Sequence, residues 1–103
     1  MGLDVITEFL AKATVRVRAY IYDDDDALVD PTPPVTIDIF DPDGTPIESG
    51  ATMTRADTGI YEYYYKTTVD SPDGWWRGVV WVVDGSGDLA KTSEGSFGFK
   101  VKS

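Results

Sequence analysis

The residues of this sequence that could carry out chemistry are almost all carboxylates. Eighteen Asp and Glu stand against nine Lys and Arg, and the 103 residues include neither Cys nor His. The chain therefore lacks the commonest general base, a thiol nucleophile and the commonest ligands of transition metals. Serine catalysis of the Ser-His-Asp type is excluded because its histidine is missing. Enzymatic functions are therefore disfavoured at the outset.

Two kinds of carboxylate site can be compared with the sequence. The run Asp23–Asp26, with Asp30 nearby, has the oxygen ligands that calcium prefers, but no D-x-D-x-D-G pattern with a distal Glu is present. Adjacent carboxylates alternate in direction along an extended chain, so a solvated acidic loop is the favoured interpretation and we expect no metal site. A glycoside hydrolase needs two carboxylates facing each other across a cleft, and nothing in the sequence pairs any two of them. We therefore predict a protein that is not an enzyme and binds no cofactor.

Charge and hydropathy limit the partners. A net charge of −9 repels the phosphate backbone, so we expect no binding to nucleic acid. The longest apolar run, Val79–Val83, is much too short to cross a bilayer, and the first residues lack the basic segment of a signal peptide. We expect neither membrane association nor export, although an extracellular or cell-surface location stays open if a leader has been removed.

The aromatic side chains, the remaining candidates for binding, must be positioned by short strands. Residues 13–22, ATVRVRAYIY, alternate between apolar residues and charged or aromatic ones, which is typical of a half-buried strand. Residues 35–40, VTIDIF, repeat the alternation, and the sequences DPDG at 41–44 and SPDG at 71–74 fit type I turns. Further strand-like segments lie around 47–53, at 60–66, at 74–84 and at 94–101.

This spacing predicts an all-β chain. About seven short antiparallel strands, separated by turn signals at intervals near ten residues, are most simply arranged as a single β-sandwich over residues 13–103. Residues 1–12 are ambiguous, and we interpret them as an N-terminal arm or a first edge strand.

Several segments carry a family resemblance, in this order: VRVRAYIYDDDD, VTIDIFDPDGT, TGIYEYYY, GWW and EGSFGFKV. Over residues 13–102 the chain resembles the small immunoglobulin-like β-sandwich proteins encoded among the head and tail genes of tailed bacteriophages, and more distantly bacterial Ig-like and macroglobulin-type domains. The resemblance implies a virion component made in the bacterial host cytoplasm. It also implies that Trp76, in the pattern Gly-x-Trp that begins at Gly74, packs into the core.

A second part of the resemblance concerns the segment DTGIYEY. It is similar to the Asp-x-Gly-x-Tyr corner of immunoglobulin domains, which implies that the Tyr61 hydroxyl ties back to the chain upstream. Two strand-like segments follow the corner here, and Tyr63 stands in the place of the disulfide cysteine. An antibody-type strand topology is therefore not expected.

The segment GWWRGVVWVVD, residues 74–84, has apolar side chains on both faces of its predicted strand. With Trp76 inward, alternation also directs Gly78 inward, where it leaves room for a bulky neighbour from the facing sheet. The same alternation directs four apolar side chains outward: Trp75, Val79, Trp81 and Val83. Together they could expose several hundred Å² of apolar surface, around or above the roughly 400 Å² of a well-behaved soluble surface.

Three ways of shielding this outward face from solvent remain possible. The arm of residues 1–12 could lie over it through Val5, Ile6, Phe9 or Leu10. Another protein, either a second copy or a larger assembly, could dock on it, since Trp and Tyr most often anchor interfaces. The face could also stay in solvent with Arg77 and nearby lysine stems folded across the rings.

We predict a structural or interaction protein, most simply a phage virion accessory component at the capsid surface or head–tail region. Its partners are expected to be virion proteins or a second copy, bound through an aromatic sheet face and the N-terminal arm. The expected interface residues are Trp75, Trp81, Val79, Val83, Tyr20, Tyr22 and Tyr64. The alternative is a recognition module of a bacterial cell-surface protein that binds carbohydrate or a protein ligand, because a flat row of Trp and Tyr on a sheet can stack sugar rings.

Overall fold

The chain forms eight β-strands in the computed structural model, which describes residues 2–11, 14–23, 25–31, 35–67, 71–84 and 91–101. The strands are β1 (Gly2–Ala11), β2 (Thr14–Tyr22), β3 (Thr36–Phe40), β4 (Pro46–Thr52), β5 (Thr54–Asp57), β6 (Ile60–Lys66), β7 (Gly74–Asp84) and β8 (Lys91–Val101). At the ends of some strands only the backbone is described, and this applies to Leu10, Ala11, Val83, Asp84, Lys91 and Thr92.

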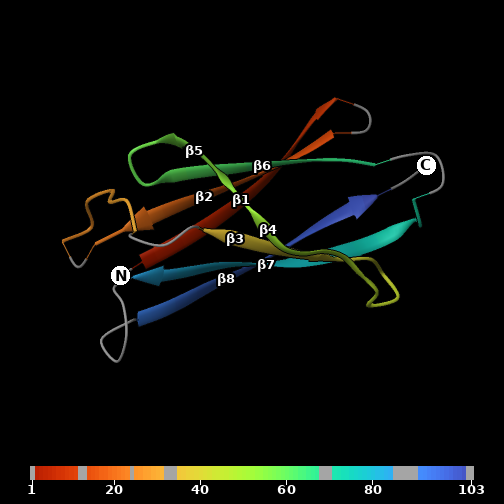
Figure 1. The fold of residues 1–103 in the computed structure, drawn as a ribbon. Helices are drawn as coiled ribbons and strands as arrows, with labels where there is room; N and C mark the ends of the chain where they lie inside the picture. The colour runs from red at the N-terminus through yellow and green to blue at the C-terminus, as the bar shows by residue number, and fades with distance from the viewer. Residues whose placement is uncertain are drawn as a thin grey trace.

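The strands form two antiparallel four-stranded sheets. Sheet A has the order β1-β2-β6-β5, and sheet B has the order β4-β3-β7-β8. Figure 1 shows the two sheets as layers, with the β4–β5 segment passing from one layer to the other. The all-β sandwich expected from the strand spacing is therefore confirmed.

The core lies between the sheets and follows the alternation of the sequence. In β2 every second residue from Val15 to Ile21 is fully buried, and β3 and the residue before it bury Val35, Ile37 and Ile39. Trp76 is the largest core side chain, at 1% exposure, and its indole nitrogen donates a hydrogen bond to the Pro72 carbonyl at 3.0 Å. Trp76 thus occupies the core position that the Gly-x-Trp pattern implies.

The strand count exceeds the expected seven because the segment near residues 47–53 is followed by a separate strand. Met53, which is 3% exposed, separates β4 from β5 and donates its backbone N–H to the Val35 carbonyl at 2.8 Å. The chain changes sheets at this buried residue, since β4 pairs with β3 and β5 pairs with β6. Sequence alternation alone does not mark such a crossing.

The N-terminal segment is an edge strand. β1 pairs with β2 from Gly2↔Tyr22 to Ala11↔Thr14, and its inward residues pack against β8. Phe9 and Phe99 meet edge to face with ring centroids 6.3 Å apart, and the Thr7 hydroxyl donates to the Gly98 carbonyl at 3.3 Å. Described residues of this segment thus form the edge strand of sheet A, and the suggestion that the segment covers the outer face of residues 74–84 is wrong, because β1 belongs to the opposite sheet.

Gly78 is inward-facing, but its bulky neighbour is not the expected one. A Cβ at this position would lie 2.1 Å from Cζ of Phe97, on the adjacent strand of the same sheet. The side chain that needs this space thus comes from β8 and not from the facing sheet. The reason is the register, which places Gly78 directly opposite Phe97.

The Tyr61 corner is built around Asp30. Asp30 accepts hydrogen bonds from the Gly59 backbone at 2.8 Å and from Arg55 at 3.0 Å, and it also interacts with the Tyr61 hydroxyl. Burial, followed by the negative charge of Asp30, raises the pKa of Tyr61. Asp30, which lies upstream of the tyrosine in the chain, is therefore a charged group that acts on the Tyr61 hydroxyl.

Candidate docking surface

The outer face of sheet B is organised as four rows of side chains across the strands. On β7 the outward residues Trp75, Arg77, Val79 and Trp81 lie opposite Lys100, Gly98, Ser96 and Glu94 of β8. On β3 the outward residues Phe40, Asp38 and Thr36 lie opposite Arg77, Val79 and Trp81. We call this set of outward residues of β3, β7 and β8 the B face.

Trp75 is the most exposed large apolar side chain of the B face. Its relative exposure is 64%, while the next residue along the strand, Trp76, is in the core. On its β8 side lies Gly98, whose missing side chain leaves one edge of the indole uncovered. An indole held on a rigid strand and open to solvent is suited to anchoring a partner.

Trp81 is held differently, at the other end of the same strand. Its indole nitrogen donates a hydrogen bond to Oδ2 of Asp38 at 2.8 Å, and the side chain is half-buried. Oδ1 of Asp38 accepts the backbone N–H of Gly50 at 2.7 Å, where φ is +67°. Asp38 therefore links the Trp81 ring to β3 and β4. Because the ring is held by this hydrogen bond, the side of the ring that faces solvent has one orientation toward a partner.

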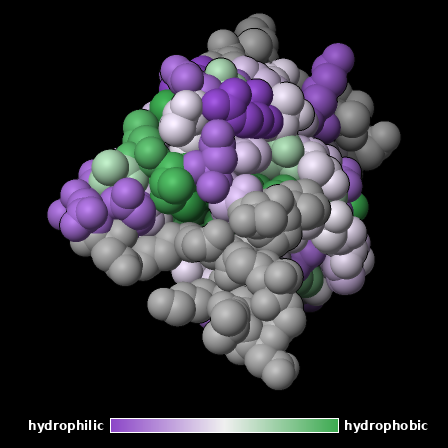
Figure 2. Space-filling model, turned by 60° about the vertical axis from the view of Figure 1, so that its left-hand side comes forward, coloured by the Kyte–Doolittle hydropathy of each residue, from purple (hydrophilic) through white to green (hydrophobic). Residues whose placement is uncertain are grey.

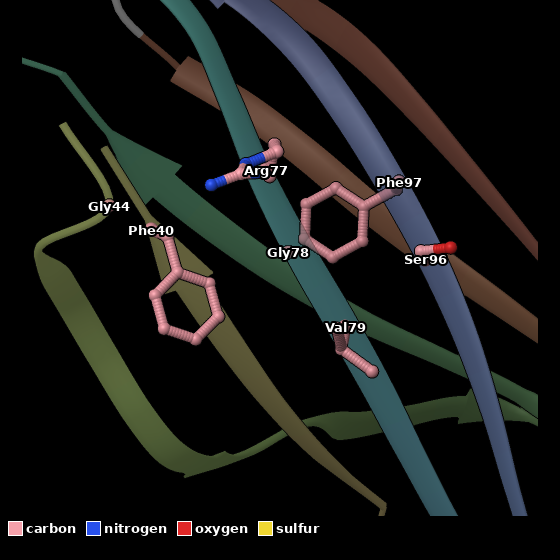
Figure 3. A pocket seen from close by; sticks show the side chains of 7 residues that line it. All are labelled: Phe40, Gly44, Arg77, Gly78, Val79, Ser96 and Phe97. Carbon is pink, nitrogen blue, oxygen red and sulfur yellow. The ribbon is translucent and has the colours of Figure 1, made fainter. Parts of the chain in front are cut away.

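Between the two tryptophans the B face is hollowed. A cavity of about 410 Å³ is lined by Phe40, Gly44, Arg77, Gly78, Val79, Ser96 and Phe97. Figure 3 shows the Phe97 ring reaching from β8 toward Gly78, with Phe40 and Val79 on either side of the hollow. On the β8 side of the hollow, Ser96 and Gly98 are small and project little toward solvent. The B face thus combines projecting aromatic rings with a concave centre.

Two cations on the B face have no partner among the described residues. The side chains of Arg77 and Lys100 are exposed, and neither side chain forms an ion pair or hydrogen bond with any part of the chain that the structure describes. Arg16, Arg18 and Arg55, by contrast, each pair with a carboxylate. In a chain of net charge −9, these two cations lie beside an exposed indole, and both can form ion pairs with an acidic group of a partner.

The three tyrosines expected around the tryptophans lie elsewhere. Tyr20 and Tyr22 of β2 and Tyr64 of β6 are on the outer face of sheet A, on the opposite side of the sandwich from Trp75. The expectation of one continuous aromatic surface is therefore wrong. Alternation tells which residues point outward, but it does not tell which sheet a strand joins.

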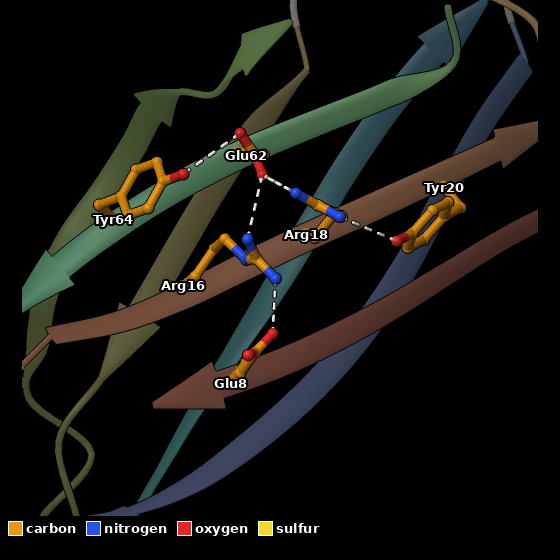
Figure 4. A network of polar contacts seen from close by, with 6 residues as sticks. All are labelled: Glu8, Arg16, Arg18, Tyr20, Glu62 and Tyr64. Carbon is orange, nitrogen blue, oxygen red and sulfur yellow. Dashed lines mark hydrogen bonds and ion pairs between the residues drawn. The ribbon is translucent and has the colours of Figure 1, made fainter. Parts of the chain in front are cut away.

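The outer face of sheet A carries a polar network in place of an apolar patch. Glu62 accepts hydrogen bonds from Nε of Arg18 at 2.9 Å and from its NH2 group, and Arg16 lies between Glu62 and Glu8. Figure 4 shows Arg18 and Arg16 converging on Glu62, with Tyr20 and Tyr64 at the margins of the network. The hydrogen bond from Arg18 holds the pKa of Glu62 below its ordinary value.

In the acidic loop the Asp23 carboxylate binds the backbone of the loop itself. Oδ1 of Asp23 accepts the backbone N–H groups of Asp25 and Ala27 at 2.8 and 3.0 Å. Figure 2 brings the left-hand side of Figure 1 forward and shows hydrophilic residues, in purple, projecting both above and below a group of hydrophobic residues in green. Among the described residues no three carboxylates gather into a group that could hold a metal ion.

The expected interface residues are only partly brought together. Trp75, Val79 and Trp81 share the B face, and the Val83 side chain lies outside the described residues. Sequence reasoning missed Phe40, Asp38 and Lys100 as members of this surface. The alternation in VTIDIF and EGSFGFKV already directs these residues outward, but only the pairing of β3 and β8 with β7 places them beside the tryptophans.

Comparisons with known proteins add no family. No family model matches the chain, and no curated protein is similar to it. The described residues include no helix long and apolar enough to span a membrane.

Proposed function

We propose that this chain is a non-catalytic interaction protein that docks onto a partner protein through the B face. The observation that carries the proposal is the position of Trp75, whose indole is 64% exposed on a strand that is anchored in the core by its neighbour Trp76. Burying an exposed indole on a rigid scaffold gives a large gain in apolar contact at little entropic cost.

The rest of the B face supports docking in the same place. Val79 and Phe40 extend the apolar surface, the hollow beside them accepts a projecting group, and Arg77 and Lys100 lie at its margin without partners in the described part of the chain. Interfaces commonly have this composition, with an aromatic centre and a charged rim. The outer face of sheet A differs, because its arginines Arg16 and Arg18 are already paired with Glu8 and Glu62.

The proposed setting is a phage virion, at the capsid surface or the head–tail region, with assembly in the bacterial cytoplasm. What supports this setting is the resemblance of residues 13–102 to the immunoglobulin-like proteins of tailed phages, together with the β-sandwich fold. A compact acidic sandwich without cysteine suits assembly in a reducing compartment. The N-terminal segment has no separate docking role in this proposal, because β1 is built into sheet A.

The experiment uses particles of the phage whose genome carries the chain. The purified chain is added to particles that lack it, and co-sedimentation is measured for the natural sequence, for Trp75→Ser and for the matched control Tyr64→Ser. Tyr64 is 54% exposed on the opposite face, so both substitutions remove an exposed ring. We expect Trp75→Ser to weaken co-sedimentation about tenfold or more and Tyr64→Ser to leave it unchanged. Equal binding by all three proteins would refute the role of the B face, and absence of binding by the natural chain would refute the virion setting.

A second candidate function is carbohydrate recognition by a cell-surface module. The observation that favours it is again the exposed Trp75 indole, because a sugar ring stacks on such a surface while Arg77 and Ser96 offer hydrogen bonds from the neighbouring rows. Titration with glycans would then quench tryptophan fluorescence in the natural chain and not in Trp75→Ser. Unchanged fluorescence across neutral and acidic glycans would refute this candidate.

A further inference from the structure

The B face has a tryptophan beside a charged residue at both ends, and the two charges are opposite. At one end Trp75 lies opposite Lys100, and at the other end Trp81 lies opposite Glu94. Lys100 and Glu94 are both exposed, and neither has an ion-pair partner among the described residues. The two end rows thus carry matching aromatic groups and complementary charges.

A second copy fits this pattern when the two B faces meet with their strands antiparallel. The two-fold axis lies in the interface, perpendicular to the strands and midway between the rows of Arg77 and Val79. It places β8 of one copy over β8 of the other, and it places each end row over the opposite end row of the other copy. Trp75 of each copy then lies over Trp81 of the other, and Lys100 lies over Glu94. Each pairing occurs twice because the interface is symmetric.

We propose that the chain forms a symmetric dimer through the B face, with Trp75 against Trp81 and Lys100 against Glu94 of the second copy. This inference rests on the proposed docking function of the B face and names its occupant. The alternative symmetric packing has its two-fold axis parallel to the strands. Arg77 of one copy then lies over Arg77 of the other, and Lys100 of one copy lies toward the β3 side of the other. This packing brings like charges together and leaves Glu94 without a partner, so the antiparallel arrangement is favoured.

The middle rows are compatible with this arrangement. Arg77 of each copy lies over Val79 of the other, at the margin of the hollow that Val79, Ser96 and Phe40 line. The small residues Ser96 and Gly98 face each other, so the β8 strands can approach closely. Each long Arg77 side chain therefore has a concave surface to enter, and the exposed stem of the arginine covers apolar area there.

The size of the face limits the affinity. Residues on one face of a strand recur about every 6.7 Å and strands lie about 4.8 Å apart, so four rows on the three strands of the B face cover roughly 400 Å². A dimer therefore buries about 800 Å² in total, at the low end of specific interfaces. We expect a weak dimer, with a dissociation constant in the micromolar range or above.

The experiment is sedimentation equilibrium of the whole chain from about 1 µM to about 1 mM, combined with charge reversals. Lys100→Glu places two carboxylates against each other in the dimer, and Glu94→Lys places two ammonium groups there. Each variant alone is expected to dimerise about tenfold more weakly than the natural chain or worse. An equimolar mixture of the two variants is expected to regain dimers, because each of the two end contacts in a mixed dimer then joins one carboxylate and one ammonium group.

The matched control is Lys66→Glu, which makes the same charge change at an exposed position of sheet A and should leave dimerisation unchanged. A natural chain that stays monomeric to about 1 mM would overturn the dimer, and so would variants that dimerise normally or a mixture that does not recover. If the chain is monomeric but Trp75→Ser still loses binding to particles, the proposed function stands and only the dimer fails. If the charge reversals behave as expected while no chain binds particles, the dimer stands and the virion setting fails.

Discussion

Trp81 donates its indole N–H to the Asp38 carboxylate across two neighbouring strands, with 2.8 Å between Nε1 and Oδ2. The same carboxylate accepts the backbone N–H of Gly50. One side chain on β3 thus sets the orientation of an aromatic ring on β7 and closes the irregular pairing of β3 with β4. The half-buried state of Trp81, in contrast to exposed Trp75, follows from this bond.

Replacing Asp38 tests the bond directly. Asp38→Ala removes the acceptor for two donors, and we expect the free energy of unfolding to fall by about 2 kcal/mol. Asp38→Asn retains one oxygen and should lose less. Urea unfolding followed by tryptophan fluorescence measures both, with Asp43→Ala on the exposed 41–44 turn as the control. If Asp38→Ala is as stable as the natural chain, Asp38 does not hold Trp81.

Gly78 is predicted to tolerate no side chain. A Cβ there would lie 2.1 Å from the Phe97 ring and 2.6 Å from the Asp38 carbonyl, so Gly78→Ala should destabilise the fold by about 1–3 kcal/mol. The control is Gly98→Ala on β8, where the nearest atom would be 3.4 Å away and only a small change is expected. Adding Phe97→Leu to Gly78→Ala should recover part of the loss. Thermal unfolding of the four proteins gives the answer, and equal melting temperatures for Gly78→Ala and Gly98→Ala would contradict the packing described.

Glu62 is predicted to make stability depend on pH. Its pKa is held below the ordinary value by Arg18, so its contribution is fully present above the pKa in the unfolded chain, about 4.3, and is lost as pH falls from there through the lower pKa of the folded state. At pH 7 we expect Glu62→Gln to cost up to about 1 kcal/mol, a melting-temperature decrease of about 4–8 °C.

The check is to repeat this comparison as pH falls from about 4.3 toward about 2.5, where the difference between the two proteins should shrink as Glu62 gains a proton in the folded chain as well. Asp4→Asn is the control, since Asp4 is exposed on the same sheet face and has no ion pair among the described residues. A difference between the natural chain and Glu62→Gln that persists unchanged at low pH would rule out the charge network as its origin.

Much of the fold could be predicted because alternation is a local property of a strand. The inward residues of β2, β3 and β8 follow it. The choice of Trp76 over Trp75 as the inward ring comes instead from the Gly-x-Trp pattern of the resemblance, and alternation then assigns the rest of that strand. The crossing at Met53 could not be predicted in the same way. It depends on a buried residue whose backbone bonds to Val35 from another strand, and no periodicity marks that contact.

The candidate surface could be predicted along one strand and not across strands. Trp75, Val79 and Trp81 belong to one segment, so a single register places them all on one face. Whether Tyr64 or Phe40 lies beside them depends on which strands pair with β7, a non-local choice made by the packing of the whole chain. The space at Gly78 also depends on strand pairing. Alternation predicts that this inward position leaves space, but only the pairing of β7 with β8 shows that Phe97 of the same sheet fills it.

The most direct test of the B face as a docking surface is the accessibility of the three indole N–H groups, followed by NMR with a soluble gadolinium chelate. In a dilute sample the Trp75 signal should broaden most, while Trp76, bonded to Pro72, and Trp81, bonded to Asp38, should stay sharper. On docking, either to particles or to a second copy at high concentration, Trp75 should become protected. A Trp75 signal as protected as that of Trp76 in the dilute chain, or one that keeps its full broadening when the chain is bound, would contradict the account.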